Sequence, residues 1–165
     1  MSLFYSLVIA QILIIGVGAT IITDLWATTR KWLWGVPMLN YALVGRWVGH
    51  MPQGYFTHSS IGAAAPKAFE TLLGWAVHFL TGIAFAACFV LWQGTDWLSA
   101  PRLLPALIFG VATVVFPFFV MQPASGAGWA ASRTPHPWRA RLHSLVLHAV
   151  FGLGLYASAL LLASW

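Results

Sequence analysis

Four long apolar runs limit what this chain can fold into. They cover residues 3–28, 69–92, 103–122 and 142–163 of a sequence of 165 residues. A helix needs about 20 residues to cross a hydrocarbon core of about 30 Å. The runs lack the alternation of polar and apolar residues that marks barrel strands, and a helix satisfies its own backbone hydrogen bonds in lipid. The sequence therefore predicts an all-α polytopic membrane protein, a four-transmembrane-helix bundle forming a single domain over residues 1–165.

The composition supports a membrane protein. Hydrophobic residues make up 60% of the chain and charged residues 7%, whereas soluble domains carry about 25% charged residues. The first run has no basic stretch before it and is longer than the apolar part of a secretory signal, so we expect it to be retained as the first span.

The basic residues predict an orientation. The two long connectors hold seven of the eight, namely Arg30, Lys31, Arg46, Lys67, Arg133, Arg139 and Arg141, and Arg102 is alone on the other side. The positive-inside rule then places both long connectors in the cytoplasm and both termini outside. Topology and contact with the bilayer and its anionic lipid headgroups account for the net charge of +5, so no nucleic-acid partner is expected.

Ionisable and polar residues inside the runs predict a pocket. Such groups are costly in lipid and usually mark a function, and here they fall in the cytoplasmic half of the predicted bundle. The second run places Glu70, Gly74, His78, Thr81 and Cys88 on one face. The candidate pocket residues are Asp24, Glu70, His78, His148, Thr20, Thr81, Ser144 and Tyr156. Helices usually turn such small and polar faces toward each other.

The stretch "GRWVGHMPQGYFTH", residues 45–58, lies between the first two runs. After Pro37 the spacing is helical, with Arg46 and His50 four residues apart on one face. A solvated loop would be less apolar, so the spacing predicts an interfacial or re-entrant helix between spans 1 and 2. We expect the cytoplasmic rim of the pocket to be formed by Arg46, His50, His58 and Arg133.

Several blocks carry a family resemblance. They are "TDLW", "GRWVGHMPQGYFTHSSIGAAAP", "GWAVHFLTGIAF", "FPFFVMQPASGAGWAASRTP" and "HAVFGLGLYASAL". Together they resemble one family of small bacterial inner-membrane proteins that is catalogued only as a domain of unknown function. The resemblance covers essentially the whole chain and implies a four-span protein of the bacterial inner membrane. It implies no activity and no role for any residue.

Three functions remain open from the sequence. The first is transport or permeation of an ion or small polar solute, which in so small a chain requires a homo-oligomer. The second is a non-enzymatic assembly or lipid-binding role. The third is a redox role in which His78 and His148 hold haem b or a metal ion, although no cofactor is the first expectation. An enzyme is less expected, because the chain has no H-E-x-x-H or G-x-S-x-G motif.

Overall fold

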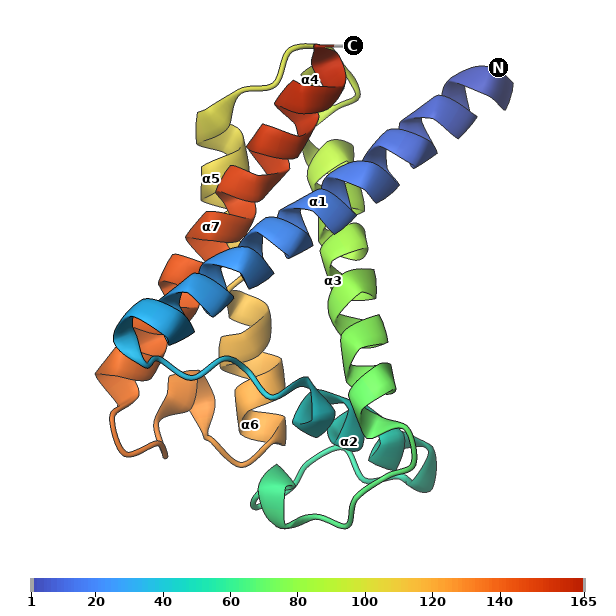
Figure 1. Cartoon of the computed structure of the whole chain (residues 1–165). Coiled ribbons are helices and arrows are strands. Elements are labelled where there is room, and N and C mark those ends of the chain that lie inside the picture. Colours follow the sequence, from blue (N-terminus) through green and yellow to red (C-terminus); the bar gives the residue numbers. More distant parts are fainter. Residues whose placement is uncertain (1, 165) are drawn as a thin grey trace. The chain divides into compact units, whose positions relative to one another are not determined.

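The computed structural model describes residues 2–164, which form helices and loops without a strand. The α-helices, labelled in Figure 1, are α1 (Ser2–Trp34), α2 (Tyr41–His50), α3 (Glu70–Gln93), α4 (Asp96–Ser99), α5 (Leu103–Ala112), α6 (Gln122–Ala124) and α7 (Pro137–Ala163). The short helical turns are η1 (Met51–Gln53), η2 (Ile61–Ala63), η3 (Pro117–Met121) and η4 (Trp129–Ala131). The predicted all-α fold is confirmed.

The four predicted spans are also confirmed. They are Leu3–Trp34, Glu70–Gln93, Leu103–Ala124 and Pro137–Ala163. Only 22–33% of the residues in their most apolar windows are buried within the chain. Most of the apolar surface of each span is therefore left for lipid to cover, as expected of a multi-pass membrane protein.

Three spans differ from the prediction, and of these the fourth begins at Pro137 instead of residue 142. The first helix continues beyond residue 28 to Trp34. It ends there because the following residue, Gly35, has a left-handed backbone with φ +64°. The third span is interrupted after Ala112 and resumes as the π-helix η3, which begins at Pro117. Pro117 has no N–H to bond the carbonyl of Thr113, and its ring crowds that carbonyl. The hydrogen bond that Pro117 cannot make accounts for the end of α5 near Thr113.

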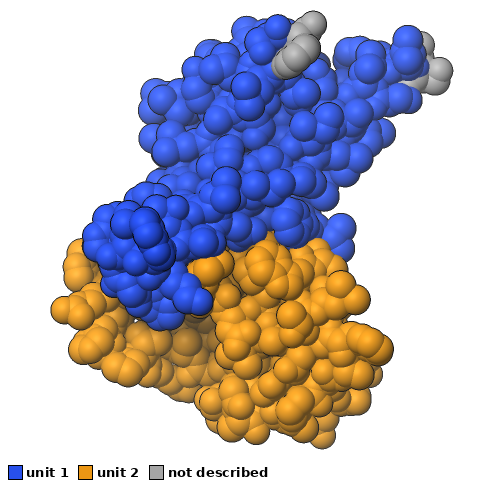
Figure 2. Space-filling view, in the orientation of Figure 1, with its two compact units in different colours: residues 1–37, 79–113, 146–165 blue, residues 38–78, 114–145 orange. Residues whose placement is uncertain are grey.

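The chain forms two compact units, coloured separately in Figure 2. Unit 1 contains residues 1–37, 79–113 and 146–165, and unit 2 contains residues 38–78 and 114–145. Whether the two units fold as the predicted single domain stays a prediction.

The helices of unit 1 approach each other at small residues. Its buried core consists of Ile15, Ala19, Ala86, Phe89, Val90, Trp97, Leu98, Ala106, Phe151, Leu155 and Ala159. A Cβ placed on Gly110 of α5 would lie 2.5 Å from the Cα of Gly152 on α7, so these helices touch backbone to backbone. The predicted inward face of the second span is wrong at Cys88, which is exposed. Gly82 and Ala86 are buried there instead, since the smallest side chains allow the closest helix contact.

Unit 2 is built on the predicted connector helix, which the structure confirms as α2. The side chain of Asn40 caps it by accepting a hydrogen bond from the N–H of Ala42 at 3.1 Å. Trp47, Ile61 and Ala124 form the buried core of the unit. Whether α2 lies in the membrane interface stays a prediction.

The two long connectors are joined by backbone hydrogen bonds inside unit 2. The N–H of His58 donates to the carbonyl of Ala124 at 2.8 Å, and the N–H of Ile61 donates to that of Ser125 at 3.1 Å. A Cβ on Gly126, whose φ is +93°, would overlap the carbonyl of Ser59, so glycine permits this close approach. The connectors therefore form one folded structure.

Candidate functional site

An ion pair anchors the connector helix. Nε and Nη2 of Arg46 on α2 each lie 2.8 Å from one carboxylate oxygen of Glu70, the first residue of α3. Nη1 of Arg46 donates to the carbonyls of Gly62 and Ala64, and the N–H of Lys67 donates to Glu70 at 2.9 Å. The two side chains are 13% and 16% exposed. This bidentate geometry is the strongest that Arg offers a carboxylate, so the pair holds α2 against the start of α3.

The pair also fixes the charge of Arg46. Its hydrogen bond to Glu70 raises the pKa of Arg46 above its ordinary value. A folded-state pKa above the unfolded value gives a stabilisation that is fully present below the unfolded pKa and is lost as the pH rises through the folded pKa. Arg46 therefore keeps its charge at every physiological pH, and its contribution to the pair is not lost there.

Two predicted rim histidines lie together in unit 2. The ring centroids of His50 and His58 are 5.0 Å apart in an edge-to-face arrangement. Nε2 of His50 lies 3.0 Å from the carbonyl of Ala65, which assigns the proton to that nitrogen. Nδ1 of His58 is buried without a hydrogen-bond partner among residues 2–164. The fourth predicted rim residue, Arg133, is exposed.

The histidines of the spans bond to neighbours in their own unit. In unit 2, Oη of Tyr41 lies 2.9 Å from Nε2 of His78, and the two ring centroids are 4.3 Å apart. In unit 1, Oγ1 of Thr113 donates to the carbonyl of Gly110 at 2.6 Å and lies 2.7 Å from Nδ1 of His148. Because the hydroxyl has one proton, Nδ1 of His148 is then the donor to it.

The other predicted pocket residues are divided between the units. Thr20 of unit 1 is buried and donates to the carbonyl of Gly16 at 2.8 Å. The half-buried residues are Asp24, Thr81 and Tyr156 in unit 1 and Ser144 in unit 2. The common polar pocket stays a prediction.

The predicted haem or metal ligands are partly engaged. Nε2 of His78 already has Tyr41 as its partner. Across residues 2–164, no three His, Cys, Asp or Glu side chains are grouped so that they could hold a metal ion. A haem needs only two axial ligands, so its binding by His78 and His148 stays a prediction.

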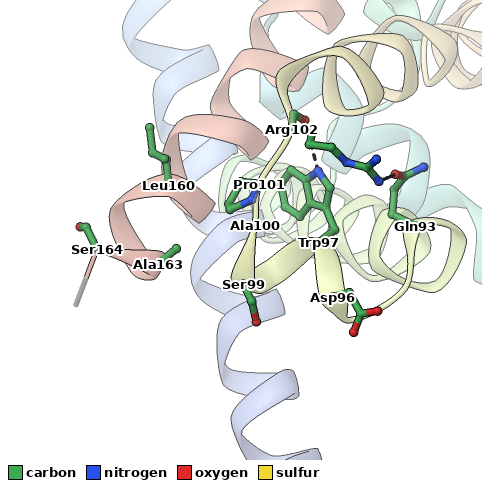
Figure 3. A pocket seen from close by; sticks show the side chains of 10 residues that line it. All are labelled: Gln93, Asp96, Trp97, Ser99, Ala100, Pro101, Arg102, Leu160, Ala163 and Ser164. Atoms are coloured by element: carbon green, nitrogen blue, oxygen red, sulfur yellow. Dashed lines mark hydrogen bonds between the residues drawn. The ribbon is translucent and has the colours of Figure 1, made fainter.

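A cavity of about 720 Å³ lies in unit 1, at the connector between the second and third spans. Trp97 and Arg102 line it, together with Gln93 and Asp96. Nε1 of Trp97 donates to the carbonyl of Arg102 at 3.2 Å, and Nη2 of Arg102 donates to Oε1 of Gln93 at 3.4 Å, as Figure 3 shows. No predicted site residue lines this cavity. The polar connector "QGTDWLSAPR" was the signal for it.

Arg30 and Trp26 are a second feature that the sequence reasoning missed. Arg30 is 6% exposed, and both its Nε and the Nε1 of Trp26 are enclosed without a hydrogen-bond partner among residues 2–164. The available signal was the recurrence of Trp26, Arg30 and Trp34 at four-residue intervals at the end of the first span.

Comparison with known proteins gives a family whose function is not known. The family described as "Protein of unknown function (DUF2938)" matches residues 13–162. No curated protein and no solved structure matches the chain.

Proposed function

We propose that this chain, which belongs to the DUF2938 family of proteins of unknown function, is a non-catalytic membrane protein that binds anionic lipid on the side of its long connectors. The observation that carries this proposal is the shortage of acids. The chain has eight Lys and Arg residues against three Asp and Glu residues, and one of the three acids, Glu70, is already paired with Arg46. Basic side chains at a membrane surface attract anionic headgroups.

The bonding of the polar span residues supports the same proposal. Glu70, His78 and His148 each have a side-chain partner in their own unit. Hydrogen bonds of this kind hold neighbouring helices together in lipid. Side chains that already bond to each other stabilise the helix bundle, whereas a transport site needs side chains that can bind and release a solute.

Lipid exchange on the purified protein tests the proposal. Each basic residue near an anionic surface contributes about 1 kcal/mol, which is about fivefold in affinity. We therefore expect the protein to retain phosphatidylglycerol at least about fivefold better than phosphatidylcholine, as measured by native mass spectrometry. The preference should weaken at high salt, because salt screens exposed charges.

Arg102→Gln provides a matched control for this experiment, because Arg102 lies on the connector between the second and third spans. It should leave the lipid preference unchanged. Equal retention of both lipids by the wild type would contradict the proposed function.

Transport of a small polar solute is a second candidate, favoured by the cavity of about 720 Å³. The cavity brings a carboxylate, Asp96, and a guanidinium, Arg102, to one lining, which suits a solute with both charges. Solute flux into reconstituted vesicles that is lost in Asp96→Asn would favour this candidate over lipid binding.

A further inference from the structure

Arg30 combines a permanent charge with nearly complete burial. Arg30 is 6% exposed, and its Nε–H has no acceptor within residues 2–164. Arginine keeps its proton in proteins, so it cannot escape the cost of burial by becoming neutral. A buried charge requires a partner of opposite sign. Glu70, at the start of the second span, already binds Arg46.

Trp26 adds a second unsatisfied donor on the same face of α1. It precedes Arg30 by four residues, which places the two side chains one helical turn apart. Its Nε1–H is also enclosed without an acceptor among the described residues. Indole and guanidinium groups donate hydrogen bonds and accept none. The group that would satisfy both is an acceptor with negative charge, and phosphate oxygens have this chemistry.

The surroundings of Arg30 on α1 favour a lipid as the source of the phosphate. Trp26 precedes it and Trp34 follows it by four residues, and the centroids of the two rings are 6.1 Å apart. Tryptophan is enriched at the level of lipid headgroups. Leu25 and Leu33 on the same helix are 62% and 52% exposed, and they offer an apolar surface for an acyl chain.

We propose that Arg30 and Trp26 form a binding site for the headgroup phosphate of an anionic phospholipid. This inference rests on the proposed function and assigns it a location. The guanidinium of Arg30 neutralises the phosphate and donates to its oxygens, and the indole N–H of Trp26 adds one further hydrogen bond. The bound lipid supplies a negative charge beside Arg30.

The test uses the full chain, stripped of lipid in neutral detergent. Heat unfolding is followed while phosphatidylglycerol, phosphatidylcholine or inorganic phosphate is added. We expect Arg30→Met to weaken phosphatidylglycerol binding about tenfold or more, since it removes a charged hydrogen-bonding partner. Trp26→Phe keeps a ring and loses one neutral hydrogen bond, so it should weaken binding about threefold. Arg30→Lys keeps the charge without the planar fork and should bind less tightly than the wild type.

The lipid-free protein separates a binding site from a structural role. Without lipid, Arg30→Met should be at least as stable as the wild type, because it removes an unpaired buried charge. A lower stability without lipid, together with an unchanged response to phosphatidylglycerol, would show that Arg30 is structural. Arg139→Gln removes the same charge from an exposed position on the same connector side, and an equal loss of binding in this control would show non-specific attraction.

The remaining outcomes distinguish the two proposals. A wild type that does not bind phosphatidylglycerol contradicts the proposed function itself. A wild type that binds it with the same affinity as Arg30→Met and Arg30→Lys contradicts only the Arg30 and Trp26 site. If inorganic phosphate stabilises the wild type as strongly as phosphatidylglycerol, the ligand is a free oxyanion and the assignment to lipid is wrong.

Discussion

Gln122 carries a buried polar atom that the fold does not satisfy. Its Oε1 is enclosed and receives no hydrogen bond from residues 2–164. A buried acceptor without a donor costs about 1–3 kcal/mol, and methionine has a similar length without the polar amide. We expect Gln122→Met to raise the free energy of unfolding by about 1 kcal/mol, as measured by heat unfolding in detergent.

The same substitution at Gln53 is the control for Gln122→Met. Oε1 of Gln53 accepts a hydrogen bond from Nζ of Lys67 at 2.6 Å on an exposed surface. Gln53→Met should therefore give no gain in stability. A Gln122→Met protein that is less stable than the wild type would mean that Oε1 of Gln122 has a donor after all.

The contacts of Arg46 and the burial of Arg30 could not be predicted from the sequence. The sequence identified Arg46 as a rim residue and Glu70 as a pocket residue, yet it did not pair them. The pairing depends on the crossing of α2 over the start of α3, where a Cβ on Gly45 would overlap the carbonyl of Glu70. Helical periodicity gives the face of one helix and does not give its contact with another. For the same reason the burial of Arg30 could not be predicted.

Helix contacts in unit 1 depend on glycine. A Cβ on Gly152 of α7 would lie 2.6 Å from the carbonyl oxygen of Ala106 and 2.9 Å from the Cα of Leu107. Both are backbone atoms of α5, so the contact cannot relax by a side-chain rotation. We expect Gly152→Ala to lower the free energy of unfolding by about 1–3 kcal/mol, the usual cost of overpacking, as measured by heat unfolding.

Gly62→Ala is the matched control for Gly152→Ala. The nearest atom to its added Cβ is Oγ of Ser60 at 3.8 Å, an ordinary contact. Gly62→Ala should have little effect on stability. Equal effects of the two substitutions would contradict the close approach of α5 and α7.

The helices themselves could be predicted from hydropathy, because lipid leaves the backbone few alternatives to a helix. The connector helix α2 was also predictable, from Pro37 before it and Pro52 after it. The short helix α4 was not predicted, since a turn of four residues has no periodicity to detect. The inward face of α3 was predicted from polar residues, whereas in the structure the small residues Gly82 and Ala86 are buried there. Hydropathy reports transfer into lipid and not the closest approach of two backbones.

At the scale of the whole molecule, the bonds between the long connectors limit the possible topologies. His58 and Ile61 of the first connector donate backbone hydrogen bonds to Ala124 and Ser125, at the end of the third span. Residues that bond in this way must lie on the same side of the membrane. An even number of crossings must then separate them, and the second and third spans provide two. These bonds agree with the predicted topology, in which both long connectors share a side, and the side itself stays a prediction from the charge distribution.

Cysteine labelling tests the predicted orientation. The natural Cys88 is first replaced in Cys88→Ala, and Thr57→Cys or Ser99→Cys is then added, both at exposed positions in connectors. Seven of the eight basic residues lie in the long connectors or at the span ends next to them, and basic segments of this kind are retained in the cytoplasm. In intact bacterial cells, a membrane-impermeant maleimide should label Ser99→Cys, and it should label Thr57→Cys only after lysis. Labelling of Thr57→Cys alone would invert the orientation and would move the Arg30 site to the outer surface. Labelling of both variants in intact cells would mean that the chain inserts in two orientations, which the charge bias is expected to prevent.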